Sequence, residues 1–360
     1  MNWPGLLLWT AAAIAIVFVS TILLRVIWRV RGEMKIRKAG PRRLLAARHR
    51  IWADPGTPDA EMLRFGPGGR AGAPRPPFTF IEEHLSGSQP CVAVRDAAGR
   101  RWRVKWGHEV RPESFAVRFA HACGYFAEVT HYVDEGRIDG VKDLTRARDC
   151  IDTDDCFREA RFELEDREVR MLFDEHSWAW DDNPFLGTPQ LSGLKMVVML
   201  LSNWDTKDRR DVARGSNTAI FEHRISPWAR EARYLIADWG GAMGKWGSNV
   251  VSRGRWDPEG FEAQTAQFVT GVRDDGIVTF GYVGQRTADV AYDIPVEHVR
   301  WFHAIVSRLT EPVLREGLLA SGANDDEAAR FARALRARVA QLGAVCSNER
   351  TADQNRQLAL

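Results

Sequence analysis

The strongest hydrophobic feature of the chain is a run from Trp3 to Leu24 that contains no charged side chain. About 20 apolar residues are enough to cross the hydrocarbon core of a bilayer as a helix. A cleaved signal peptide would need a basic start, a shorter apolar stretch and small residues at its exit, and this segment has none of these. The pattern therefore predicts one transmembrane helix over residues 3–24, within an anchor formed by residues 1–28.

A cluster of basic residues follows the apolar run directly, and only the terminal amine precedes it. By the positive-inside rule, this asymmetry predicts a single-pass protein of the cell membrane whose C-terminal body lies in the cytoplasm. The cluster could also hold the chain against anionic headgroups, or serve as a topology signal alone. Glycine and proline become frequent up to Pro77, so we expect residues 29–77 to be a juxtamembrane linker. The basic residues are Arg25, Arg29, Arg31, Lys35, Arg37, Lys38, Arg42 and Arg43.

Short apolar and alternating segments separated by turn residues come next, and they predict an antiparallel sheet with one helix. The helix has Pro112 in its first turn and Gly124 at its end. In the charged middle of the chain, 162–164 and 169–172 are interpreted as paired strands. Residues 78–175 would then form a sheet-rich N-terminal lobe. Its other expected strands cover 78–81, 91–94, 102–106 and 126–133.

A wide apolar face from Leu191 to Leu201 predicts a buried helix that ends at Asn203-Trp204-Asp205. Two short strands are expected at 218–221 and 234–237, and the chain beyond them is mostly helical. Sheet-rich first and helix-rich second is an α+β, two-lobed plan. The helical lobe would cover residues 176–345, with a polar tail over 346–360. The clearest late helices are 301–309 and 327–342.

The composition limits which binding partners are expected for the part of the chain after the anchor. Lys and Arg number 50 against 48 Asp and Glu, and the basic cluster after the anchor contains more basic residues than this excess. The body itself is mildly acidic, so no nucleic-acid partner is expected. The five cysteines form no Cys-x-x-Cys pair, which suits a reducing compartment, although Cys150 and Cys156 could pair if the topology were reversed. The histidines show no metal-ligand spacing.

The candidate chemistry lies in a series of polar residues placed at the edges of these elements. Lys105 stands inside an expected strand, and Glu113 stands in the first turn of the next helix. Asp205 directly follows the apolar helix, and Lys207 comes two residues later. Each of these alone has an ordinary explanation, such as an exposed strand residue or a helix-dipole partner.

Two more residues complete the series. Asn217 immediately precedes one expected strand, and Asp238 ends the other and is followed by Trp-Gly-Gly. A carboxylate at the end of a buried strand beside glycines suits a hard metal ion, although a simple turn is the better explanation of Asp-x-Gly taken alone. Taken in order, the residues provide a cation for phosphates, ligands for Mg²⁺ and a carboxylate to orient an acceptor hydroxyl, as phosphoryl transfer requires.

On these residues the chain resembles the protein-kinase-like superfamily, in particular its atypical branch of HipA-type and phosphoinositide-kinase-like enzymes, over Phe78 to about Gly247. The resemblance implies ATP and Mg²⁺ as cofactors. Lys105 in Val-Lys-Trp-Gly would bind the phosphates and Glu113 would hold Lys105, with Glu109 as the alternative. The resemblance further implies Asp205 as the catalytic aspartate assisted by Lys207, and Asn217 and Asp238 as the Mg²⁺ ligands.

Three features depart from that family pattern. No Gly-x-Gly-x-x-Gly is present, and only Gly87 in Leu85-Ser86-Gly87-Ser88 is available to cover the phosphates. The interval from Asp205 to Asn217 is long, so Asn203 or Asp208 could take the role assigned to Asn217. No Ala-Pro-Glu segment follows Asp238.

The sequence therefore predicts a membrane-anchored atypical kinase, an ATP-dependent phosphotransferase with an unidentified acceptor. The alternatives are a pseudokinase or partner-binding module on the same fold, and transfer of AMP instead of phosphate.

Overall fold

The structure is a computed structural model, and it describes Ser20 and residues 48–87, 89–165, 169–171, 177–249 and 251–358. Apart from Ser20, the predicted membrane span over 3–24 and the basic cluster after it lie outside these residues. Among the residues described, no helix is both long enough and apolar enough to cross a membrane.

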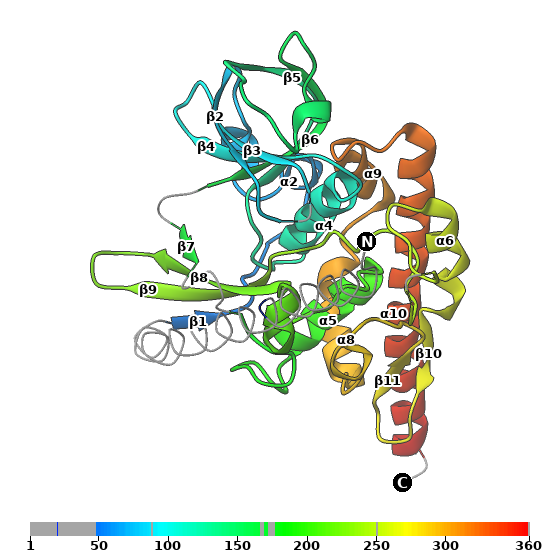
Figure 1. Ribbon diagram of the computed structural model, residues 1–360. Helices are drawn as coiled ribbons and strands as arrows, with labels where there is room; N and C mark the ends of the chain where they lie inside the picture. Colours follow the sequence, from blue (N-terminus) through cyan, green and yellow to red (C-terminus); the bar gives the residue numbers. More distant parts are fainter. Residues whose placement is uncertain are drawn as a thin grey trace, which may run out of the picture.

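Five strands between Phe78 and Leu164 form a closed barrel (Figure 1). Neighbouring strands pair antiparallel, as expected, but the barrel is closed by a parallel pair in which Phe78 lies opposite Ile138. Alternate side chains such as Trp102, Val104 and Phe162 point inward and are fully buried. In barrel order the strands are β2 (Phe78–His84), β3 (Cys91–Arg95), β4 (Arg101–Lys105), β6 (Cys156–Leu164) and β5 (Thr130–Asp139).

A second sheet has the order β1 (Arg48–Arg50), β9 (Arg230–Ile236), β8 (Thr218–Arg224) and β7 (Val169–Met171). The predicted pairing of 162–164 with 169–172 is wrong, because the first segment pairs inside the barrel and the second pairs with β8. The expected strands at 218–221 and 234–237 are β8 and β9, which form an antiparallel hairpin.

The predicted linker over 29–77 is wrong for its second half, because residues 48–77 belong to the folded body. They contain β1, α2 (Ala60–Phe65) and α3 (Gly69–Gly72), and β1 pairs parallel with β9. Ile51 and Leu63 are almost completely buried. The glycines that suggest a linker instead make turns, since Gly66, Gly68 and Gly69 all have positive φ around α2 and α3.

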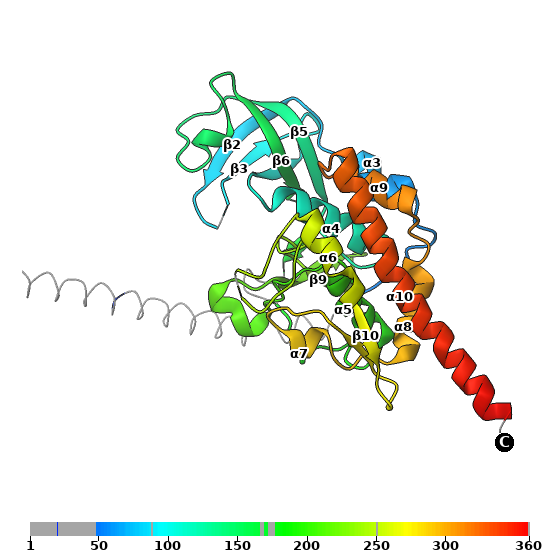
Figure 2. The same cartoon turned by 90° about the vertical axis from the view of Figure 1, so that its right-hand side faces the viewer.

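The helical part is built around α5 (Pro189–Leu200), which Thr188 caps by accepting a hydrogen bond from Leu191 N. In Figure 2, α10 runs along one side of this region, where it packs on α6, α8 and α9. The helices expected at 301–309 and 327–342 are α8 and α10, and α10 continues to Leu358 through the expected tail. The elements are α4 (Val110–Ala122), α6 (Pro258–Ala263), α7 (Thr287–Val290), α8 (Val296–Val306), α9 (Glu311–Leu319), α10 (Asp325–Leu358), the hairpin β10 (Val269–Val272) and β11 (Val278–Phe280), and the 3-10 turns Arg148–Cys150, Arg209–Arg214 and Thr265–Gln267.

The guanidinium of Arg338 on α10 is completely buried in the helical core. It donates to the carbonyls of Leu200 and Phe261, each at 2.8 Å, and to Ser202 Oγ at 2.8 Å. Its carbon also lies 3.7 Å from the centre of the Phe261 ring. Burial lowers the pKa of Arg338, and no carboxylate of the described residues pairs with it. Its donors therefore bind the carbonyl of Leu200 at the end of α5 and that of Phe261 in α6, and so connect the two helices to α10.

We expect Arg338→Met to lower the free energy of unfolding by more than about 3 kcal/mol, because it removes the buried donor of the Leu200 carbonyl and of the Ser202 hydroxyl. Chemical denaturation of the full chain measures this. The matched control is Arg333→Met on the same helix, where the side chain is exposed and a change within about 0.5 kcal/mol is expected. Equal effects at the two positions would contradict the role of Arg338.

His131 on β5 is a buried titratable group of the barrel. Its ring packs against Trp102 with centroids 5.9 Å apart, and the residue is only 4% exposed. Nε2 has no hydrogen-bond partner among the described groups. Burial, together with the charges of Arg118 and Arg100, lowers the pKa of His131 to about 3. The folded protein therefore holds this imidazole neutral.

In the unfolded chain, a histidine has a pKa of about 6.5. Between that pH and about 3, the unfolded chain therefore binds one proton more than the folded chain at this residue. Stability should therefore fall by about 2 kcal/mol through this group as pH drops from 7 to 5. In urea titrations at the two pH values, the free energy of unfolding of His131→Leu should fall by about 2 kcal/mol less than that of the wild type. The same change at exposed His108 is the control, and an unaltered decrease in His131→Leu would refute the assignment.

Candidate functional site

A cleft of about 350 Å³ lies between the barrel and the end of β9. Four of the predicted site residues line it: Lys105 from β4, Glu113 from α4, Gly87 from the β2–β3 turn and Asp238 from the loop after β9. A larger cavity of about 1640 Å³ lies near Arg148–Thr153 and Arg255, and none of the predicted site residues lines it. The smaller cleft is the better candidate, because charged groups from separate elements converge there.

The floor of the cleft is a chain of buried ion pairs on the barrel. Lys105 Nζ lies 3.1 Å from Glu163 Oε2, and the same oxygen lies 3.2 Å from Arg161 Nη2. Arg161 in turn forms an ion pair with Glu113. The structure therefore differs from the expectation that Glu113 holds Lys105. The strand register puts Arg161 directly opposite Lys105, so Arg161 takes the helix carboxylate and Glu163 takes the lysine.

The same burial shifts the acidity of these groups. Burial raises the pKa of Glu113, and the charge of Asp238 adds to that rise while Arg161 and Lys105 oppose it. The pKa of Lys105 is lowered, first by burial and then by the charge of Arg161. Opposed shifts of an acid and a base in one cleft are typical of functional sites, although buried ion-pair networks produce them too.

Asp205, Lys207 and Asn217 form a second group beside the cleft. Lys207 Nζ lies 3.3 Å from one carboxylate oxygen of Asp205, and Gln285 Nε2 donates to the other at 3.0 Å. Asn217 Nδ2 donates to the carbonyl of Asp205 at 2.8 Å. The carbonyl of Asn217 accepts a hydrogen bond from Ala237 N at 2.8 Å, which brings Asn217 next to Asp238.

Gly240 and Gly241 lie between Asp238 in the cleft and the group formed by Asp205, Lys207 and Asn217. A Cβ on Gly240 would lie 3.1 Å from Asp238 Oδ1, and a Cβ on Gly241 would lie 3.1 Å from Asp205 Cβ. The glycines therefore allow the two aspartate segments to approach closely. Asp238 Oδ1 also accepts a hydrogen bond from Gly240 N at 2.9 Å, which is the turn bond expected of Asp-x-Gly. The second oxygen of Asp238 is left for other partners.

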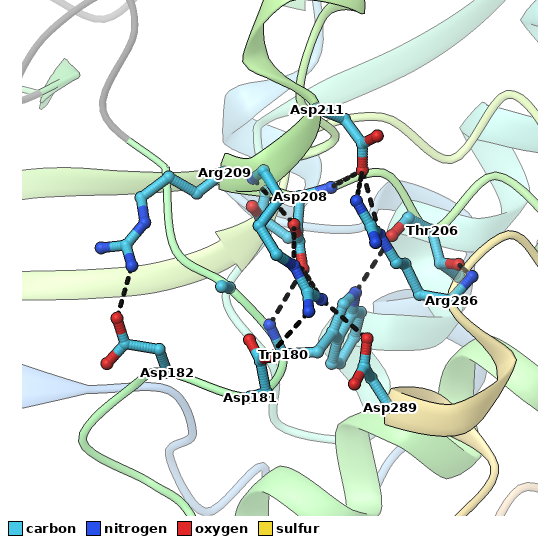
Figure 3. A network of polar contacts seen from close by, with 12 residues as sticks. Trp180, Asp181, Asp182, Thr206, Asp208, Arg209, Asp211, Arg286 and Asp289 are labelled. Carbon is cyan, nitrogen blue, oxygen red and sulfur yellow. Dashed lines mark hydrogen bonds and ion pairs between the residues drawn. The ribbon is translucent and has the colours of Figure 1, made fainter. Parts of the chain in front are cut away.

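The insertion between Asp205 and Asn217 is fixed by its own polar network (Figure 3). Asp208 is completely buried, caps the 3-10 turn through Arg210 N, accepts from Trp180 N at 3.1 Å and pairs with Arg210. Asp211 pairs with Arg286. The oxygens of Asp208 are therefore occupied by the fold, which argues against a metal-binding role for it.

Asn203 is the other alternative to Asn217, and its position is different. It is 1% exposed, and its Oδ1 has no hydrogen-bond partner among the described groups. A Cβ on Gly241 would lie 2.8 Å from that oxygen. Asn203 therefore holds an unpaired acceptor beside the aspartate segments.

Sequence reasoning missed Arg161, Glu163 and Gln285. Glu109, the alternative partner for Lys105, forms its ion pair with Arg255 at 2.8 Å instead. The alternation Arg161-Phe162-Glu163 signals a strand with one charged face. It does not identify the neighbouring strand, on which the pairing depends.

No family model, curated protein or solved structure matches this chain. The kinase-like resemblance therefore rests on the residues of the chain itself.

The residues around Asp238 fit a magnesium ion only in part. In the described portion of the chain, no three His, Cys, Asp or Glu side chains are grouped to hold a metal. Magnesium usually binds proteins through one or two carboxylates and takes its remaining oxygens from phosphates and water. The free oxygen of Asp238, the amide oxygen of Asn217 and the unpaired Oδ1 of Asn203 are compatible with that arrangement. They are not sufficient for a site made of protein side chains alone.

We expect Glu163→Gln to destabilise the protein by about 3 kcal/mol or more, because it leaves Lys105 and Arg161 without their shared buried anion. Glu82→Gln is the matched control in the same barrel, because its pair with Arg101 is half exposed and should contribute less than about 1 kcal/mol. Thermal and urea unfolding of both variants measure the difference. A Glu163 variant as stable as the Glu82 variant would show that the network contributes little.

Proposed function

We propose that this protein is a membrane-anchored, kinase-like phosphotransferase that uses Mg²⁺ and ATP and acts on an acceptor still to be identified. The observation that carries the proposal is the convergence of Lys105 and Asp238 in one cleft, although 133 residues of sequence separate them (238 − 105). A strand lysine facing a carboxylate at a strand end is suited to a nucleotide phosphate and its metal ion.

The roles of the other residues follow from their contacts. Lys105 would neutralise phosphate charge when protonated, and Arg161 would add to the positive field beside it. Asp205 accepts a hydrogen bond from Gln285 and pairs with Lys207, and it would position the acceptor hydroxyl. Lys207 would bind the transferred phosphoryl group. Asp238 and Asn217 would hold the magnesium ion, which neutralises phosphate charge when it is bound.

The membrane anchor in this proposal rests on the uncharged run over 3–24 and the basic cluster that follows it. A cytoplasmic body would have access to ATP. A catalytic domain held at the bilayer would also meet membrane-associated acceptors at high effective concentration.

Binding of Mg-ATP is tested by thermal unfolding of the full chain, with nucleotide and metal added separately and together. A ligand at about 100 times its dissociation constant stabilises the folded state by about 2.7 kcal/mol, which is visible in the melting temperature. We expect a magnesium-dependent increase that Asp238→Asn abolishes. Asp275→Asn, in the exposed β10–β11 turn, should retain it. Absence of any shift at millimolar ATP would overturn the proposal.

The nucleotide product separates the alternatives once binding is established. Phosphoryl transfer leaves ADP, whereas AMP transfer releases diphosphate. Binding without either product would indicate a pseudokinase whose function is to bind a partner.

A further inference from the structure

The turn that joins β8 to β9 exposes an apolar tip. Trp228 is 96% exposed and Ile225 is 59% exposed, and Pro227 and Ala229 between and beside them are also exposed. In Figure 1 the hairpin extends beyond the ends of β1 and β7, so the tip stands clear of the body. A fully exposed tryptophan beside other apolar residues marks an interaction surface rather than a packing residue.

The tip is preorganised. Ile225 N donates to the carbonyl of Ala229 at 3.0 Å, and Ser226 Oγ accepts from Trp228 N at 3.2 Å and Ala229 N at 3.0 Å. The turn therefore presents the indole on a hydrogen-bonded frame, and little conformational freedom is left to lose on binding.

The surroundings of the tip are basic. Arg224 and Arg230 face each other across the hairpin at the base of the turn, and both are exposed. The two carboxylates of the hairpin are buried and paired: Glu222 binds Arg230, and Glu231 binds Arg50 and Arg233. An apolar tip with a basic base complements a bilayer that carries anionic headgroups.

The chain enters the folded body next to this tip. Arg48, the first residue of β1, pairs with Glu231, two residues from Ala229. The predicted span and basic cluster precede Arg48 directly in sequence. The chain that arrives from the predicted anchor therefore joins the body beside the tip, which favours a membrane over a protein partner as its occupant.

We propose that the tip of the β8–β9 hairpin is a second membrane contact, which inserts Trp228 and Ile225 into the headgroup region of an anionic bilayer. Tryptophan is enriched at this depth because its ring is apolar and its N–H is polar. A second contact beside the predicted anchor would fix one face of the body toward the lipid. This inference depends on the predicted anchor and not on the proposed reaction with ATP.

The test uses the full chain with a protease site introduced between residues 43 and 48, reconstituted in vesicles that contain phosphatidylserine. After cleavage, sedimentation measures the share of the released body that stays on the vesicles, and its melting temperature before and after cleavage verifies the fold. We expect the wild-type body to remain bound. Ile225→Ser with Trp228→Ser should weaken binding at least about tenfold. Val251→Ser is the matched control, since Val251 is also 96% exposed but lies elsewhere, and it should bind as wild type does.

Release of the wild-type body, or retention of the double variant, would overturn the proposal. So would self-association of the released body without vesicles that the double variant abolishes, because the tip would then be a protein contact. Vesicles of phosphatidylcholine alone should bind less, because the arginines lose their anionic partners. Alkaline extraction of the uncut chain tests the predicted span separately.

Discussion

The bond between Arg338 and the carbonyl of Leu200 is the interaction on which the candidate site depends, because it fixes the end of the central helix. Beyond that point the carbonyls of the chain are bound one after another by different elements. Met243 N binds Leu201 O at 2.7 Å, the Tyr282 hydroxyl binds Asn203 O at 2.5 Å, and Asn217 Nδ2 binds Asp205 O at 2.8 Å. The segment that carries Asp205 is thus irregular and yet fixed, since these carbonyls accept from backbone and side-chain donors of other segments rather than from a helix or sheet.

This arrangement explains how a long interval between Asp205 and Asn217 is compatible with a compact site. The insertion folds as a capped 3-10 turn whose two aspartates, Asp208 and Asp211, are neutralised by arginines. It returns the chain to Asn217, whose backbone N–H bonds to the carbonyl of Lys207 at 3.0 Å. The additional residues therefore form a closed loop and do not separate the groups at either end.

The sequence was sufficient to predict positions but not partners. The apolar residues around Lys105 place it in a strand, those before Asp238 place it directly after one, and the apolar face after Thr188 predicts α5. The partner of Lys105 depends on which strand lies beside β4 and in which register, and that strand follows more than 50 residues later (156 − 105). Residues 48–77 were predicted as linker because composition averages over Ile51 and Leu63, whose burial is decided by distant elements.

The ion pairs of the cleft place a physical condition on the proposed chemistry. Glu163 is a buried anion that already occupies Lys105, and it is only 2% exposed. An incoming phosphate would have to compete with it, and a displaced carboxylate would be left in a poorly solvated site. Arg103 and Arg161 both lie within ion-pair distance of Glu163, so they could neutralise it while Lys105 turns to the phosphate. Because three cations surround this one carboxylate, Lys105 could change partner without leaving Glu163 as an unpaired buried charge. A single Lys–Glu pair would not allow this.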